Sequence, residues 1–206
     1  MKNTLKLIYA TTNGAKLSSM RRMLAGLPLD ITGLRDLEAA LPRVDETGAA
    51  PLDNAVIKAK AYYAVLKQPL FSCDSGLWIE GLPDNLQPGI HVRNVQGKYL
   101  DDEQMIAYYS GLARDLGGKA AAQYINAVCL ILNEREIFTL GGDEISHKKF
   151  IISGTPHKKR RAGFPLDSLS VHIATGNYYL DLESQDEQTL KNEKGFRNFF
   201  TRALKL

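Results

Sequence analysis

The chain has 206 residues, of which 44% are hydrophobic and 24% charged, a composition typical of a globular protein with one sizeable core. Its 26 basic and 23 acidic residues leave a net charge of +3, which argues against nucleic-acid binding by bulk electrostatics. Because the two cysteines form no disulfide framework and no apolar run reaches membrane-spanning length, we expect a cytoplasmic protein with no membrane partner.

The chain opens with an apolar strand over 5–10, a polar turn over 11–16 and an amphipathic helix over 17–27. A helix start offers unpaired backbone N–H groups and a partial positive charge, and Lys16 in this turn would add a full charge. Thr11 and Asn13 supply further polar groups. The turn therefore predicts a phosphate-binding site, with an ordinary capped helix and a solvated lysine as the alternative.

The later elements alternate between strands and helices and then become mainly strands. We expect strands over 30–34, 69–72, 120–132, 136–140 and 149–153, an extended segment over 77–80, and helices over 53–63, 101–116 and 190–206. This order is typical of a mixed α/β sheet. Since no internal repeat or low-complexity linker interrupts it, we expect a single domain over 1–206.

Two acidic residues from separate segments are candidate metal ligands: Glu46 in a loop and Asp74 just past a strand. Two such carboxylates can hold one Mg²⁺ ion, which prefers oxygen ligands and keeps waters that a substrate phosphate can replace. One carboxylate could also orient an attacking water as general base, while the metal and lysines absorb charge on the phosphate. Asn54 and Lys58, four residues apart, project from one side of a helix. The alternatives are a simple Asx turn at Asp74 and a solvated acid at Glu46.

A third polar cluster comes late in the chain. Phe164 and Asp167 lie in a glycine-led loop, and Lys191 and Arg197 lie in the closing helix. An aromatic face with an acid suits stacking on a nucleobase and reading its edge, while the two cations suit further polar or phosphate contacts. The alternatives are a core role for Phe164 and a solvated helix face for the cations. The basic run over 157–161 is either a solvated loop or a rim that attracts a polyanion, and we favour the rim.

The order of these clusters resembles the inosine triphosphate pyrophosphatase family, whose members hydrolyse non-standard purine nucleoside triphosphates. The likeness covers nearly the whole chain, from about residue 7 to about residue 204. The family's motifs T-x-N-x-x-K, E-T-G, N-A-x-x-K-A, D-D-S-G-L and P-G-x…R correspond to residues 11–16, 46–48, 54–59, 73–77 and 88–93.

The resemblance implies an α/β fold in which an elongated mixed β-sheet, bent into two lobes and flanked by helices, binds the nucleotide in a cleft between the lobes. It implies a homodimer that uses Mg²⁺ to hydrolyse ITP, dITP or XTP to the monophosphate and pyrophosphate. Asp74 would be general base and metal ligand, Glu46 a second metal ligand, and Lys58 a catalytic group. The implied substrate contacts are Thr11, Asn13, Lys16, Asn54, Ser75, Phe164, Asp167, Lys191, Phe196 and Arg197.

The chain departs from the family pattern mainly in the base-reading motifs. Cys73 replaces the first aspartate of D-D-S-G, and a thiol is a poor magnesium ligand. The motif G-F-G-Y-D-P loses its tyrosine, and K-x-x-x-S-H-R carries Gly195 and Phe196 in place of serine and histidine. Phe196 could add a second aromatic wall around the base. Two alternatives follow: a nucleotide-binding homologue with weakened or lost catalysis, and a pyrophosphatase for other modified nucleotides, such as methylated or bulky pyrimidine triphosphates.

Overall fold

The structure is a computed structural model that describes residues 4–182 and 187–206, with side chains described up to residue 182 and again from Glu193 onward. Its internal contacts divide the chain into two compact units. The first unit comprises Met1–Ser75, Ile125–Ser146 and Leu190–Leu206, and the second comprises Gly76–Tyr124 and His147–Thr189. The single domain expected over 1–206 stays a prediction.

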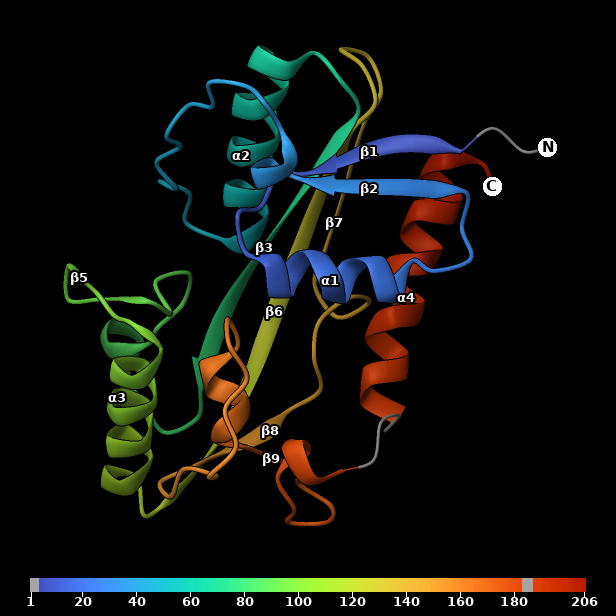
Figure 1. The fold of residues 1–206 in the computed structure, drawn as a ribbon. Coiled ribbons are helices and arrows are strands. Elements are labelled where there is room, and N and C mark those ends of the chain that lie inside the picture. Colours follow the sequence, from blue (N-terminus) through green and yellow to red (C-terminus); the bar gives the residue numbers. More distant parts are fainter. Residues whose placement is uncertain (1–3, 183–186) are drawn as a thin grey trace. The chain divides into compact units, whose positions relative to one another are not determined.

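The first unit is built on parallel strands. β1 (Leu5–Tyr9) pairs along its whole length with β2 (Leu29–Gly33), and the two lie side by side in Figure 1. On its other edge, β1 pairs with β3 (Leu70–Ile79) only through Ile8 and Tyr9. β3 therefore continues beyond the carboxyl end of β1, and this overhang carries the Cys73-Asp74-Ser75 segment.

Helices cover both faces of these strands, because their sequences present apolar stripes. Leu17 and Met20 of α1 (Gly14–Met23) share one core with aromatic residues of α4 (Glu187–Leu204). A second core contains Ala55 and Ala59 of α2 (Pro51–Leu66). Small residues at this four-residue spacing allow α2 to pack closely on the strands.

The expected hairpin is confirmed. β6 (Lys119–Ile131) and β7 (Ile137–Gly141) pair antiparallel, and Oδ1 of Asn133 in the turn accepts hydrogen bonds from the backbone N–H groups of Arg135 and Glu136. The side chain of Asn133 thus forms an Asx turn that reverses the chain.

The second unit packs α3 (Asp102–Asp115) near β8 (Phe150–Ser153), which pairs with β6 and with β9 (Ser170–Val171). Three residues of the predicted apolar stripe of α3 are buried: Met105, Ile106 and Tyr109. The short strands β4 (Asn94–Val95) and β5 (Lys98–Tyr99) form a separate hairpin. The strand order of the large sheet is β2-β1-β3-β6-β8-β9, with β7 pairing with β6.

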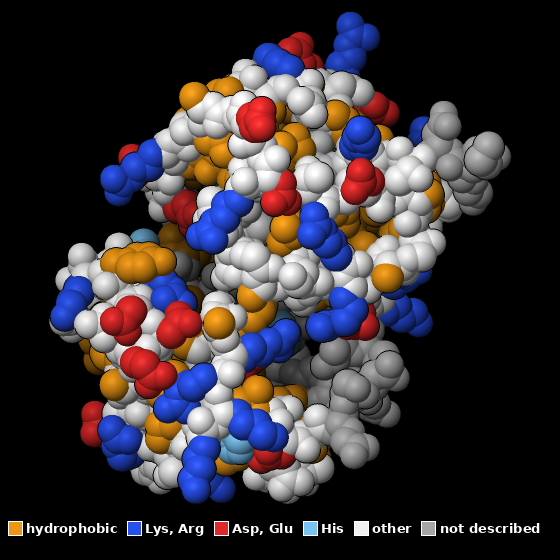
Figure 2. All heavy atoms as spheres, in the orientation of Figure 1, with side chains coloured by type: hydrophobic (Ala, Val, Ile, Leu, Met, Phe, Trp, Pro, Cys, Tyr) orange, Lys and Arg blue, Asp and Glu red, His pale blue; other side chains and the backbone are white. Residues whose placement is uncertain are grey.

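The predicted α/β class with a mixed sheet flanked by helices is confirmed, with differences at the element ends. α1 begins three residues earlier than expected, because Asn13 caps its first turn. The second half of the loop expected at 163–167 is instead part of a 3-10 helix, Pro165–Ser168. Within the described residues no helix is long and apolar enough to cross a membrane. On the face shown in Figure 2, basic and acidic side chains are interspersed.

Candidate active site

The candidate site of the first unit lies on the part of β3 that extends past β1. Successive side chains of a strand point to opposite faces, so Ser72 and Asp74 share the face that α2 covers. The Ser72 hydroxyl donates a hydrogen bond to the Ala55 carbonyl, and Asp74 accepts one from Lys58. Asp74 thus lies within β3, not just past a strand as expected, and beyond the carboxyl end of the parallel neighbour β1, where open α/β sheets usually bind ligands.

Lys58 connects the two acids that the sequence predicts as metal ligands. Its Nζ lies 2.9 Å from Oδ1 of Asp74 and 3.1 Å from Oε1 of Glu46. The side chains of Lys58 and Asp74 are only 13% and 10% exposed, whereas that of Glu46 is 43% exposed. Burial alone would lower the pKa of Lys58, but the Asp74 and Glu46 carboxylates raise it above its ordinary value. The three predicted residues therefore form one ionic cluster.

The second carboxylate oxygen of Asp74 distinguishes this cluster from an ordinary ion pair. Oδ2 is buried and has no hydrogen-bond partner among the residues that the structure describes. A buried charged oxygen without a partner is costly, so such an atom is expected to meet a ligand, an ion or water. Asp74 thus holds Lys58 with one oxygen and keeps the other available.

Asn54 has a positioning role, and its predicted substrate contact stays a prediction. Asn54 is 1% exposed, and its Oδ1 accepts a hydrogen bond of 2.8 Å from the Gly48 N–H. A Cβ on Gly48 would lie 2.4 Å from the Cβ of Asp53, so only glycine allows the loop to approach α2 this closely. The contact anchors the loop that carries Glu46.

The polar turn before α1 is a capped helix start. Oδ1 of Asn13 accepts hydrogen bonds from the N–H groups of Ala15 (2.9 Å) and Lys16 (3.2 Å), and the Asn13 N–H donates to Oγ1 of Thr11. The expectation that these two helix N–H groups are unpaired and bind phosphate is therefore wrong. Direct phosphate contacts by Thr11 and Asn13 stay predictions, whereas their observed role is to shape the turn.

The Lys16 side chain nevertheless approaches the ionic cluster. Burial lowers its pKa first and the Lys58 ammonium lowers it further, while Asp74, Cys73 and Glu46 act in the opposite direction. Glu46, Lys58 and Asp74 thus lie in contact and Lys16 interacts electrostatically with them, while their convergence around a metal ion and a polyphosphate stays a prediction.

Cys73 is a half-buried thiol whose surroundings favour its neutral form. Burial raises its pKa to about 12, although hydrogen bonding to Tyr9 and the nearby lysines lower it. Tyr9 in turn stacks on Phe71, with ring centroids 4.6 Å apart. Where the family pattern has a charged carboxylate, this chain therefore has a neutral group beside the site.

Ser75 has a partner that the sequence did not reveal. Its hydroxyl donates a 2.7 Å hydrogen bond to Oδ1 of Asn126, whose Nδ2 donates to the Ile145 carbonyl. The Asn126 N–H also donates to the Ser146 hydroxyl. Asn126 is buried in β6, and only the pairing of distant segments could identify it.

The second unit contains the Phe164 loop. Cζ of Arg161 lies 4.6 Å from the Phe164 ring centroid, and Nη1 of the same side chain lies 3.0 Å from Oδ2 of Asp167. Burial raises the pKa of Asp167, and Arg161 opposes that shift. Phe164 and Asp167 thus share a cation that the sequence analysis did not single out.

The basic run over 157–161 is largely neutralised within the second unit. Asp181 lies 3.1 Å from both His157 and Lys159, and Arg160 pairs with Glu103 at 2.8 Å. Acids of other segments thus pair with these residues, and the favoured interpretation as a rim that attracts a polyanion stays a prediction.

Two predicted contacts from the closing helix have other roles. Phe196 is 5% exposed and packs in the core with Phe199 and Phe200, so the second aromatic wall around a base is wrong. Arg197 donates hydrogen bonds to the carbonyls of Met23 (3.3 Å) and Ala25 (2.6 Å). Its positive charge there stabilises the carboxyl end of α1, which carries a partial negative charge. The side chain of Lys191 lies outside the described residues.

Comparison with known proteins identifies the family. Residues 7–149 match the Ham1 family. The chain belongs to the Ham1 family. The resemblance to inosine triphosphate pyrophosphatases is therefore confirmed.

Three related proteins show how far the similarity of this Ham1 chain extends. A dITP/XTP pyrophosphatase of Symbiobacterium thermophilum is 34% identical over 128 residues, and the match covers 62% of this chain and 61% of that protein, less than two thirds of its length. One from an Exiguobacterium species is 31% identical over 195 residues, covering 93% and 92%. The solved structure of a HAM1 protein from Coxiella burnetii has the same fold, with a TM-score of 0.75 at 22% identity over 98% of this chain and 100% of that one.

The residues of this Ham1 protein fit a magnesium ion that takes part of its coordination from elsewhere. Across the described ranges, no three His, Cys, Asp or Glu side chains gather into a metal site. Asp74 and Glu46 nevertheless offer carboxylate oxygens in one cluster, and Oδ2 of Asp74 is buried without a partner in the described part of the chain. Mg²⁺ is usually bound by one or two carboxylates together with waters and substrate phosphates, which agrees with this donor set.

Proposed function

We propose that this Ham1 protein is a magnesium-dependent nucleoside triphosphate pyrophosphatase that hydrolyses non-standard purine nucleotides. ITP, dITP and XTP would be converted to the monophosphate and pyrophosphate. Membership of the Ham1 family supports the proposal, as do relatives that carry the name dITP/XTP pyrophosphatase. The single observation that carries it is the Glu46–Lys58–Asp74 cluster, in which Oδ2 of Asp74 is buried and has no partner among the residues described.

In the proposed reaction Asp74 is the general base. Lys58 holds Oδ1, so Oδ2 is the oxygen that would accept the proton of an attacking water. Lys58 and Lys16 would stabilise the negative charge that develops on the phosphoryl oxygens. Glu46 and Asp74 would hold the magnesium ion, which when bound polarises the phosphoryl group. Asn54 would keep Glu46 in place through the Gly48 backbone.

The test is pyrophosphate release from ITP, dITP, XTP and the common nucleoside triphosphates, each with and without Mg²⁺. We expect turnover that requires the metal and is fastest with the non-standard purines. Absence of turnover with every triphosphate, under conditions where the protein is folded, would refute the proposal. The homodimer also stays a prediction, which light scattering on the purified protein would test.

A second candidate function is a pyrophosphatase for other modified nucleotides. It is supported by the positions of two residues in the altered motif: Phe196 is buried in the core, and Arg197 donates a hydrogen bond to the Ala25 carbonyl just after α1. A hydrogen bond to a base edge is worth about 1–3 kcal/mol of discrimination, so losing such contacts changes the preferred base. If a methylated or bulky pyrimidine triphosphate is turned over faster than ITP, this second candidate is correct. Nucleotide binding with negligible hydrolysis would instead indicate a homologue that has lost catalysis.

A further inference from the structure

Together with the neighbouring Lys16, the ionic cluster of the first unit carries no net charge. Glu46 and Asp74 contribute one negative charge each, and Lys58 and Lys16, which both interact with them, contribute one positive charge each. A pair of acids that waited for a resident divalent cation would instead keep its negative charge uncompensated. The carboxylates of this chain are therefore already neutralised by the protein itself.

Lys58 also takes the position between the acids. Its Nζ contacts an oxygen of each, at 2.9 and 3.1 Å, and Asp74 and Lys58 are largely buried. A divalent ion added to this neutral, poorly solvated cluster would leave two uncompensated positive charges, which is unfavourable in a low-dielectric environment. The same ion bound to a triphosphate brings an excess of negative charge and avoids this cost.

One acceptor remains for the incoming complex. Oδ2 of Asp74 is buried, belongs to a side chain that is nine-tenths buried, and has no partner within the described part of the chain. It is thus an oxygen that can meet an ion while Oδ1 still holds Lys58. Its presence shows that the neutral cluster is not a closed structural ion pair.

Resting on the proposed function, we propose that Lys58 excludes the divalent ion from the free protein, so that the ion enters only together with the polyphosphate. The phosphates then attract Lys58 and Lys16, and the two carboxylates become available to the metal. Metal and nucleotide therefore bind with positive coupling, and by linkage each increases the affinity of the protein for the other.

The experiment measures Mn²⁺ binding to the full-length protein by electron paramagnetic resonance of the free ion, with Mn²⁺ in place of Mg²⁺. It is repeated with a non-hydrolysable α,β-methylene analogue of ITP, after correction for the affinity of Mn²⁺ for the analogue alone. We expect weak binding to the free protein and an affinity at least about tenfold higher in the presence of the analogue, within the usual range of coupling between two ligands.

The Lys58→Met variant tests the role of the lysine directly. Removing the ammonium leaves the two carboxylates and Lys16 with a net charge of −1, so we expect the free variant to bind Mn²⁺ about tenfold more tightly than the wild type and to show weaker coupling to the analogue. The matched control is Lys60→Met, because Lys60 is an exposed lysine of the same helix that does not belong to the cluster; its Mn²⁺ affinity should equal that of the wild type.

Two results would overturn the proposal: equally tight Mn²⁺ binding to the wild type with and without the analogue, or weaker binding to Lys58→Met than to the wild type. If circular dichroism shows that Lys58→Met does not fold, the wild-type comparison decides alone. These measurements need no turnover, so they are distinguishable from a failure of the proposed function, which would show as absent hydrolysis of every triphosphate.

Discussion

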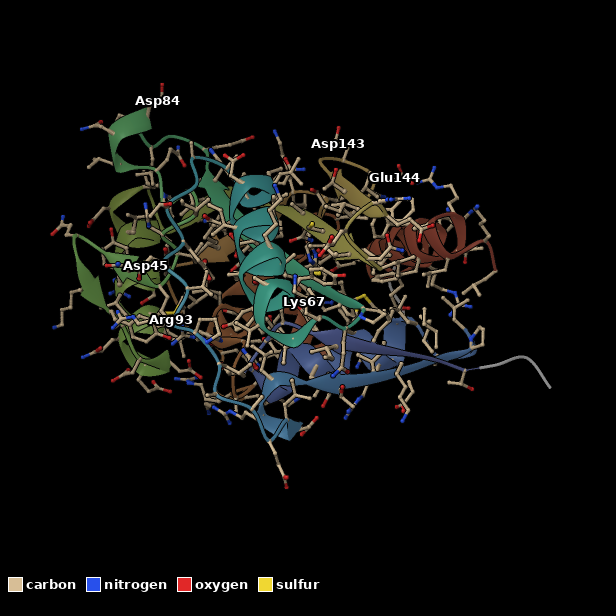
Figure 3. All side chains as sticks on the ribbon, turned by 90° about the horizontal axis from the view of Figure 1, so that it is seen from above. Asp45, Lys67, Asp84, Arg93, Asp143 and Glu144 are labelled. Carbon is tan, nitrogen blue, oxygen red and sulfur yellow. The ribbon has the colours of Figure 1, made fainter. Side chains whose placement is uncertain are left out.

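Gly195 determines how closely α4 can pack against the segment that follows β7. A Cβ at this position would lie 2.1 Å from the carbonyl oxygen of Glu144 and 3.2 Å from Cγ2 of Ile145. Glu144 lies beside α4 in Figure 3, and its carboxylate also pairs with Arg202 of that helix at 2.7 Å. Gly195→Ala therefore forces two backbone segments apart, and no side-chain rotation can relieve the contact.

The magnitude follows from two opposing effects. The added carbon would be about 1 Å closer to the oxygen than the ~3.3 Å at which such atoms normally meet, and overpacking of this kind costs about 1–3 kcal/mol. Alanine is favoured over glycine inside a helix by about 1 kcal/mol, which offsets part of that cost. We expect Gly195→Ala to lose up to about 2 kcal/mol in the free energy of unfolding.

The assay is urea unfolding followed by far-UV circular dichroism, with Gly111→Ala as the matched control. Gly111 also lies inside a helix, but its Cβ would meet only the flexible end of Arg114, at 3.6 Å. We expect this control to gain up to about 1 kcal/mol in stability. If Gly195→Ala is as stable as the wild type or more so, the close packing of α4 on Glu144 is refuted.

Three further predictions concern the site. Asp74→Asn should lower pyrophosphate release by about 10²–10⁴-fold while the circular dichroism spectrum stays unchanged, because an amide cannot accept the proton; a near-normal rate would remove Asp74 from the role of base. Phe164→Ala should weaken nucleotide binding by about 1–3 kcal/mol in calorimetry if the ring stacks on a base, and an unchanged affinity would exclude that contact. Burial raises the pKa of Cys73 to about 12 and that of Cys129 to about 11, so both thiols stay protonated at pH 8, and the thiolate fraction grows only as the pH rises toward those values. Iodoacetamide should therefore label both thiols slowly in the folded protein at pH 8 and rapidly after denaturation. Fast labelling of the native protein would contradict the raised pKa values of the two thiols.

Much of the first unit could be predicted from local sequence. The apolar strand before Thr11 and the helix that carries Lys58 follow from hydrophobic periodicity, which depends only on neighbouring residues. Residue types and motif order singled out Glu46, Lys58 and Asp74. In the structure Nζ of Lys58 lies within 3.1 Å of a carboxylate oxygen of each acid. The sequence by itself thus determined the α/β class and the ionic centre of the candidate site.

Only the tertiary structure decided the roles of side chains whose partners come from distant segments. Phe196 is as compatible with a base-binding wall as with a core, and it became a core residue because α4 packs its aromatic stripe on the strands. Arg197 found its acceptors in Met23 and Ala25, more than 170 positions away in the chain. Asn126 fixes the Ser75 hydroxyl across two strands. A local pattern specifies which face of an element is apolar, but burial and hydrogen bonding depend on which distant atoms meet that face when the chain folds.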